Sequence, residues 1–265
     1  MSKRCVEIIP LVKNGNMTKK SLKELDVSGL ESILYLWGQE KKVFQSEAQF
    51  QFNLAWRLQE LYDCEAKLED LTVVVTRKNK SDKEFMQKVY TDIVLVKDDY
   101  YVAIELKYKT ATLKHKDILL FNHGASDLGR YDFLWDVNRL ELLVDPAKRN
   151  RETPLARAEE IKVFRHCAKG FAILLTNEKG YWKKSYNDEK ETIDKQFCIG
   201  EADGCLYGKT LDWKKKNGEY TNTINNTSRA RSIVLNKAYH YQWKPYCELS
   251  AAENNNFKYL IIETL

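Results

Sequence analysis

Two apolar runs separated by a pair of aspartates predict a buried β-hairpin in the first half of this 265-residue chain. Residues 90–97 and 100–109 are rich in Val, Ile and Tyr, and Asp98-Asp99 between them fits a tight turn. A third β-branched run, residues 71–76, precedes them across a charged loop. Together the three runs predict an antiparallel meander, which restricts the chain to folds built around a sheet.

Helices are predicted on both sides of this meander in the sequence. Capping-box patterns at Ser28 and Ser46 and apolar residues at helical spacing indicate four helices, over residues 28–40, 46–62, 127–143 and 154–167. Later apolar runs predict strands at residues 171–175, 232–235 and 257–262. Because no Pro/Gly/Ser-rich linker divides the chain, we expect a single α/β domain over residues 1–265.

The predicted hairpin carries charged residues among its apolar ones. Asp92 lies near the start of its first strand, and Glu105 and Lys107 lie near the end of the second. Twelve residues separate Asp92 from Glu105, which allows a strand, a turn and a returning strand, so both carboxylates reach one end of the sheet. Glu105 and Lys107 are two positions apart and share a face. Burying these charges is costly without a compensating partner, and a divalent cation supplies one.

This pattern, an Asp on one strand followed by Glu-x-Lys on the next, resembles the PD-(D/E)XK nuclease superfamily, which includes many restriction enzymes and recombination exonucleases. The resemblance implies a restriction-endonuclease-like αβββαβ core with a mixed sheet flanked by helices. The predicted element order follows that core over about residues 46–176, so residues 1–45 and 177–265 are N- and C-terminal elaborations. Thr91 stands where many members have a proline, at a position that varies in the superfamily.

The resemblance also implies roles for the charged residues. Asp92 and Glu105 are expected to bind Mg²⁺ or Mn²⁺ with the backbone carbonyl of Leu106, while Lys107 orients or polarises the attacking water. The chemistry agrees, because carboxylate oxygens suit these hard cations and phosphodiester cleavage needs a metal-activated water.

Many members of the superfamily add an acid from the first core helix. Glu47 lies on the apolar stripe at the start of the helix predicted over residues 46–62, and we expect it to be this auxiliary catalytic acid. Glu60, which lies off the stripe, is the weaker candidate.

A second motif concerns nucleic-acid binding. RecB-type members carry Gln-x-x-x-Tyr on the helix after the catalytic strands, and residues 127–131 have that spacing with Asp in place of Gln. By this resemblance, Arg130 and Tyr131 are expected to contact nucleic acid, and Lys109 extends the basic character beside the catalytic lysine. A surface ion pair of Arg130 with a neighbouring aspartate is the alternative.

Composition narrows the function classes. The chain has 43 basic and 38 acidic side chains, a mild excess that suits an anionic partner without demanding one. It has no run of about 20 apolar residues that could span a membrane, and no apolar signal-peptide region, so a cytoplasmic protein is expected. The six cysteines form no C-x-x-C pair and the four histidines lack zinc-ligand spacing, which argues against a zinc hydrolase.

The expected function is therefore that of a Mg²⁺-dependent nuclease, with DNA ahead of RNA as the substrate. The alternative is a catalytically inactive module of the same fold that binds nucleic acid or a protein partner. The sequence leaves open the strandedness of the substrate, endo- against exonucleolytic cleavage, and the oligomeric state, a homodimer included.

Overall fold

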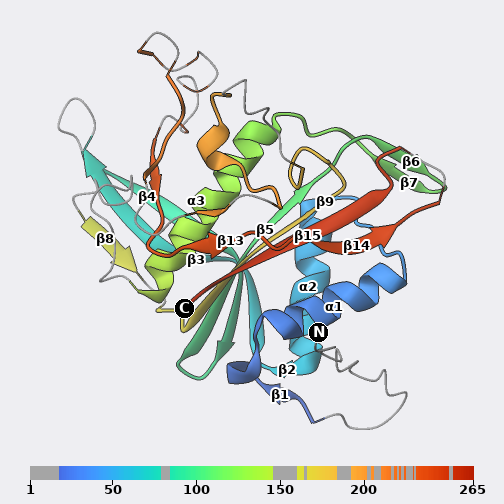
Figure 1. Ribbon diagram of the computed structural model, residues 1–265. Helices are drawn as coiled ribbons and strands as arrows, with labels where there is room; N and C mark the ends of the chain where they lie inside the picture. Colours follow the sequence, from blue (N-terminus) through green and yellow to red (C-terminus); the bar gives the residue numbers. More distant parts are fainter. Residues whose placement is uncertain are drawn as a thin grey trace, which may run out of the picture.

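The structure is a computed structural model that describes residues 18–78, 84–145, 160–163, 166–183, 192–201, 204–205, 210–215, 218–219, 231–250 and 253–265, with residues 221, 224 and 229 (Figure 1). Its described part is organised around a mixed seven-stranded sheet, in which only the central pair β5 and β9 is parallel. In sheet order the strands are β14 (Lys244–Glu248), β15 (Asn256–Thr264), β9 (Lys169–Thr176), β5 (Tyr100–Lys109), β4 (Glu84–Lys97), β3 (Glu65–Lys78) and β8 (Glu160–Val163). The predicted α/β class with a mixed sheet is confirmed.

Helices cover both faces of the sheet (Figure 1). On one face α3 (Ser126–Val144) packs against β5, β9 and β15. On the other, α1 (Val27–Gln39) packs against β14 and β15, and α2 (Glu47–Leu61) against β3, β4 and β5. In the part of the chain that the structure describes, no helix is long and apolar enough to cross a membrane.

Alternate side chains of β5 enter two separate cores. Val102 and Ile104 join the core beneath α1 and α2, whereas Ala103 joins the core beneath α3. Because side chains alternate along a strand, Glu105 and Lys107 fall on the α3 face with Ala103. The strand pattern therefore decides which helix can interact with these two charged residues.

Short elements complete the described chain. They are β1 (Lys20–Ser21) paired with β2 (Tyr62–Asp63), the helical turns η1 (Leu22–Glu24) and η3 (Lys195–Phe197), the hairpin of β6 (Leu113–His115) and β7 (Ile118–Leu120), and the pairs β10 (Gly204–Cys205) with β13 (Tyr239–His240) and β11 (Thr210–Leu211) with β12 (Ile233–Val234).

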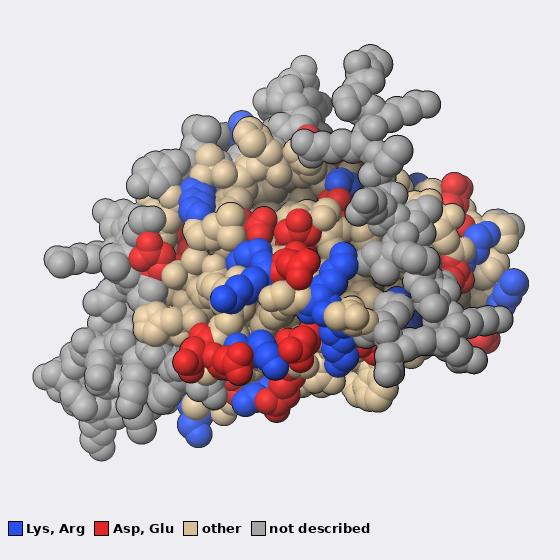
Figure 2. All heavy atoms as spheres, turned by 90° about the horizontal axis from the view of Figure 1, so that it is seen from below, with Lys and Arg blue, Asp and Glu red and all other residues tan. Residues whose placement is uncertain are grey.

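Figure 2 shows that acidic and basic side chains are interspersed on the face seen from below, so the small positive charge of the chain is not gathered into one patch there.

The helix starts agree only in part with the sequence patterns. Ser46 caps α2 as predicted, because its hydroxyl accepts a hydrogen bond from the Gln49 amide at 3.1 Å. The prediction that Ser28 caps the first helix is wrong. Asp26 is the cap, and its carboxylate accepts from the Gly29 amide at 2.8 Å. Asp and Ser are both good N-caps, and the helix begins two residues earlier than the capping-box pattern predicted.

At the edge of the sheet, the structure corrects a second prediction. A helix was predicted over residues 154–167, but residues Glu160–Val163 form β8, which pairs antiparallel with β3; residues 154–159 lie outside the described chain. Pairing with β3 satisfies backbone groups along the open side of that strand, and this long-range contact outweighs a local helical pattern. The strands predicted at 171–175 and 257–262 lie within β9 and β15, and the one predicted at 232–235 includes β12.

Gly38 provides a test of how α1 docks on the sheet. A Cβ at this position would overlap the backbone carbonyl of Tyr246 in β14. We expect Gly38→Ala to lower the free energy of unfolding by about 3 kcal/mol, as overpacking against rigid backbone does. Urea denaturation measures the loss, and Gly180→Ala is the matched control because its Cβ would meet its nearest neighbour at 3.4 Å. Equal stabilities of the two variants would contradict this packing.

Candidate functional site

The site lies where two neighbouring strands separate. β4 and β5 pair from Lys97 opposite Tyr100 as far as Ile93 opposite Ile104. Beyond that point β4 continues beside β3, and β5 continues beside β9. We call this opening between β4 and β5 the fork. The two carboxylates predicted at one end of the sheet, Asp92 and Glu105, stand immediately at the fork.

Side chains replace the missing strand partner along β5. The Leu106 amide donates to the Asp92 carboxylate at 2.6 Å, and the Tyr108 amide donates to the Glu47 carboxylate at 2.6 Å. On the opposite strand, the Asp92 carbonyl accepts from the Gln51 side chain at 2.6 Å. Buried backbone groups are costly without partners, so these contacts stabilise the fork and fix the positions of the Asp92 and Glu47 carboxylates.

Glu105 is the most deeply buried acid of the site, at 2% exposure. One of its carboxylate oxygens, Oε1, bonds to the Arg139 guanidinium of α3, while Oε2 is buried without a hydrogen-bond partner. Burial raises the pKa of Glu105 well above its ordinary value, against the opposing effect of Arg139. The unsatisfied Oε2 is therefore an acceptor suited to a further cation.

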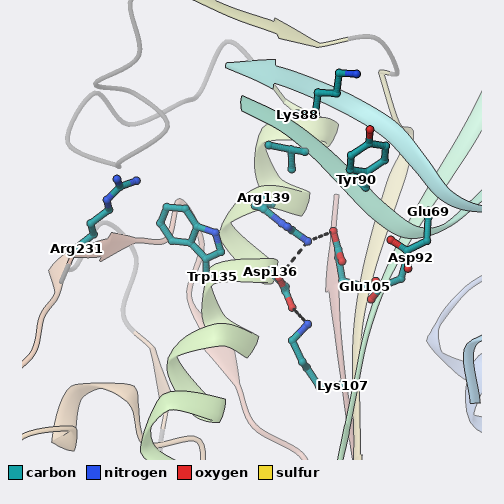
Figure 3. A pocket seen from close by; sticks show the side chains of 11 residues that line it. Glu69, Lys88, Tyr90, Asp92, Glu105, Lys107, Trp135, Asp136, Arg139 and Arg231 are labelled. Atoms are coloured by element: carbon teal, nitrogen blue, oxygen red, sulfur yellow. Dashed lines mark hydrogen bonds and ion pairs between the residues drawn. The ribbon is translucent and has the colours of Figure 1, made fainter. Parts of the chain in front are cut away.

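Lys107 belongs to the same network. Its Nζ forms an ion pair with Asp136 of α3 at 2.5 Å and donates to the Leu106 carbonyl at 3.1 Å. Asp136 also pairs with Arg139 at 3.1 Å, so an alternating chain of charges runs from Lys107 through Asp136 and Arg139 to Glu105 (Figure 3). Burial opposes the charge of Lys107, but the facing carboxylates, Asp136 foremost, raise its pKa above the ordinary value. Lys107 is thus a fixed cation and not a base.

These groups border a cavity of about 350 Å³ between α3 and the diverging strand β4 (Figure 3). Its lining carries four acids and four bases, together with Val89, Tyr90 and Trp135. The charged residues are Glu69, Asp92, Glu105 and Asp136, and Lys88, Lys107, Arg139 and Arg231. A cavity that concentrates ionisable groups in this way is a strong candidate for chemistry or for binding of a charged ligand.

Two carboxylates and a carbonyl form a donor set that Mg²⁺ or Mn²⁺ can use. Glu105, whose Oε2 has no partner, lines the same cavity as Asp92. The Leu106 carbonyl follows Glu105 along β5 and accepts a hydrogen bond from Lys107 at 3.1 Å. Within the described residues no three His, Cys, Asp or Glu side chains form a metal-holding group. Mg²⁺ commonly takes one or two carboxylates and fills its other positions with water and substrate oxygens, so the residues present fit it.

The raised pKa of Asp92 should make the stability of the protein depend on pH. Burial raises the pKa of Asp92 to about 6, with Lys107 and the Leu106 amide opposing the shift. Between about pH 4 and pH 6 the native state then binds more protons than the unfolded state, so stability falls as the pH rises through this window. Above it, the ionised carboxylate costs about 3 kcal/mol.

Asp92→Asn should therefore raise the free energy of unfolding at pH 8 by up to about 3 kcal/mol, and the gain should disappear near pH 4. Urea denaturation in EDTA at pH 4, 6 and 8 measures this difference. A variant that is no more stable than the parent at pH 8 would contradict the burial of a charge at this position.

The two acids proposed on α2 occupy different surroundings. Glu47 is half-buried and holds the Tyr108 amide, but it does not border the cavity. Glu60 pairs with Arg57 at 2.9 Å on the exposed side of α2, away from the fork. The acid that borders the cavity beside Asp92 is instead Glu69 of β3, which accepts a hydrogen bond from Gln51 at 3.1 Å.

Arg130 and Tyr131 require a correction. Arg130 is 3% exposed, pairs with Asp194 and donates to the Gly180 carbonyl at 2.8 Å. Tyr131 is buried and packs on Trp213. Contact with nucleic acid would require exposing both side chains, so the structure contradicts the expectation that they form such an interface; Arg130 is also not the surface ion pair considered as its alternative. Tyr131 belongs to the hydrophobic core beneath α3.

Lys109 is half-buried at the end of β5, two residues beyond Lys107, and is not part of the cavity lining. Two of the residues that sequence reasoning missed, Asp136 and Arg139, come from α3, and Glu69 of β3 is another. The spacing of three between Asp136 and Arg139 places them on one helix face, and this spacing was the sequence signal that they could act together. The sequence did not show that this face turns toward Glu105 and Lys107.

Comparisons of the chain with protein-family models, with curated proteins and with solved structures find no match. The function is therefore inferred from the geometry and chemistry of the fork and from the sequence pattern that it contains.

Proposed function

We propose that this chain is a metal-dependent nuclease of the PD-(D/E)XK type that hydrolyses phosphodiester bonds, with DNA favoured over RNA as the substrate. The observation that carries the proposal is the convergence of Asp92, Glu105 and Lys107 on one cavity at the fork, with the Oε2 of Glu105 buried and unsatisfied. A strand-borne Asp and a Glu-x-Lys strand are the defining pattern of that superfamily. The order α2, β3, β4, β5, α3 and β9, with the short strands β6, β7 and β8 inserted, supports it.

In this function the carboxylates of Asp92 and Glu105 and the Leu106 carbonyl would hold Mg²⁺ or Mn²⁺. The metal supplies an activated water and neutralises charge on the phosphoryl oxygens. Asp92 is oriented for this role by the Leu106 amide, and Glu105 by Arg139.

The role of Lys107 follows from its charge state. Since its pKa is raised, it acts as a hydrogen-bond donor that orients the attacking water and offsets developing negative charge. Asp136 holds the ammonium in place from α3. Glu47 would act indirectly in this scheme, by fixing β5 through the Tyr108 amide.

One observation favours the alternative of an inactive binding module. Glu105 and Asp136 already have internal counter-ions in Arg139 and Lys107, so the network is balanced without a metal. This alternative predicts salt-dependent binding of nucleic acid, no cleavage, and no dependence of binding on the carboxylates.

Thermal melting during metal titration separates the two functions. A metal held by the fork should raise the melting temperature of the parent by several degrees at a hundredfold excess over its dissociation constant, a gain of about 2.7 kcal/mol. Asp92→Asn and Glu105→Gln should lose most of that rise, each compared with its own metal-free melting temperature. Variants that respond to Mg²⁺ and Mn²⁺ as strongly as the parent would contradict the proposed metal site.

A further inference from the structure

We propose that the cavity accepts one unpaired nucleotide, so that the substrates are single-stranded nucleic acid, flaps or frayed ends and not intact duplex. This inference rests on the proposed function and specifies its substrate class. It is carried by the depth of the site, by two aromatic walls and by the order of residues along β4.

The depth of the site restricts what can reach it. Glu105, at 2% exposure, and Asp136, also buried, are among the residues that line the cavity. A volume of about 350 Å³ is at the small end of the roughly 300–1,000 Å³ of ligand pockets, the scale of a mononucleotide. A base inside a duplex is paired and stacked, so it cannot enter such a cavity unless it is first unpaired and unstacked, at a cost of a few kcal/mol.

Two aromatic side chains border the cavity from opposite sides, Tyr90 from β4 and Trp135 from α3 (Figure 3). Tyr90 is 43% exposed, although it stands beside a deeply buried site. Aromatic rings of this kind stack on unpaired bases, whose faces are free, whereas bases in a duplex already stack on their neighbours. The two walls therefore favour a base that is not paired.

The order of residues along β4 fits a strand of nucleic acid entering the cavity. Lys88, Tyr90 and Asp92 alternate along the strand and all border the cavity, so a cation, an aromatic ring and a catalytic carboxylate follow one another at roughly 6.6 Å intervals. Lys88 is exposed, as is Arg231, which borders the same cavity. Lys88 can hold a phosphate next to a base stacked on Tyr90, whereas Arg231 lies on the side of Trp135 and can hold a phosphate there (Figure 3).

Binding tests the inference without relying on cleavage. The parent protein in EDTA is titrated into fluorescein-labelled single strands and into blunt duplexes of the same sequence, and fluorescence anisotropy is read at one fixed salt concentration. We expect the single strand to bind at least tenfold more tightly. Tyr90→Ala and Trp135→Ala should each weaken its binding by about 5- to 150-fold, the range for losing one stacked base.

Tyr90→Phe keeps the ring and should bind as the parent does. Tyr35→Ala, which removes an exposed tyrosine of α1 outside the cavity, should also leave binding unchanged. Equal affinities for single strand and duplex, or Tyr90→Ala binding like the parent, would overturn the inference.

The inference and the proposed function can fail separately. Single-strand binding that depends on Tyr90, with no cleavage in Mg²⁺ or Mn²⁺, supports the cavity as a nucleotide site and overturns the nuclease. Metal-dependent cleavage of duplex at the same rate by the parent and by Tyr90→Ala overturns the inference and leaves the nuclease in place.

Discussion

Replacing Lys107 by alanine is expected to slow metal-dependent cleavage by at least about a hundredfold, which is the usual effect of removing one preorganised donor to a developing charge. The ammonium is held by Asp136 at 2.5 Å and by the Leu106 carbonyl at 3.1 Å, so it is preorganised for this role. Single-turnover cleavage at saturating metal measures the rate of the chemical step.

Lys109→Ala is the matched control for this experiment. Lys109 lies on the same strand and the same face as Lys107, but outside the cavity lining. It should cleave within a few-fold of the parent. Lys107→Ala protein that melts as a folded protein, binds the metal and still cleaves as fast as Lys109→Ala would contradict the assignment of Lys107.

The second large effect is the loss of stability expected when Arg139 is replaced by alanine. Arg139→Ala removes the partner of a carboxylate that is 2% exposed, and breaking a buried ion pair in this way costs about 3–5 kcal/mol. We expect a loss of this size in the free energy of unfolding in EDTA. Mg²⁺ should then stabilise the variant more than the parent, because a divalent cation can take the place of the guanidinium beside Glu105.

A double-mutant cycle isolates this pair, since Arg139 also contacts Asp136 at 3.1 Å. In a Glu105→Gln background, Arg139→Ala should cost much less than it does in the parent. An equal loss in both backgrounds, measured by urea denaturation, would show that Glu105 and Arg139 are not coupled, and the interpretation of the ion-pair network would be wrong.

The predictions from sequence were strongest where short-range rules decide the structure. Alternation and the Asp98-Asp99 turn fix the register of the hairpin, and register alone brings Asp92 and Glu105 to one end of the sheet. Lys107 follows from the same alternation. No knowledge of distant residues is needed for any of the three.

The remaining features depend on packing between distant segments. Asp136 and Arg139 reach the site only because α3 docks on β5 with that helix face inward. The nucleic-acid-binding role predicted for Arg130 depended on a motif in which Asp127 replaces the usual Gln. The partner of Arg130 in the structure is Asp194, which lies 64 positions away. The strand β8 exists through pairing with β3, which no local pattern encodes.

The most direct test of the central claim is a cleavage assay with linear duplex, circular duplex, single-stranded DNA and RNA, each incubated with the purified protein in Mg²⁺, Mn²⁺ or EDTA. A nuclease at the fork predicts shortened or opened products with metal, none with EDTA, and loss of the products in Asp92→Asn. Every substrate left intact in both metals by folded parent protein would contradict it.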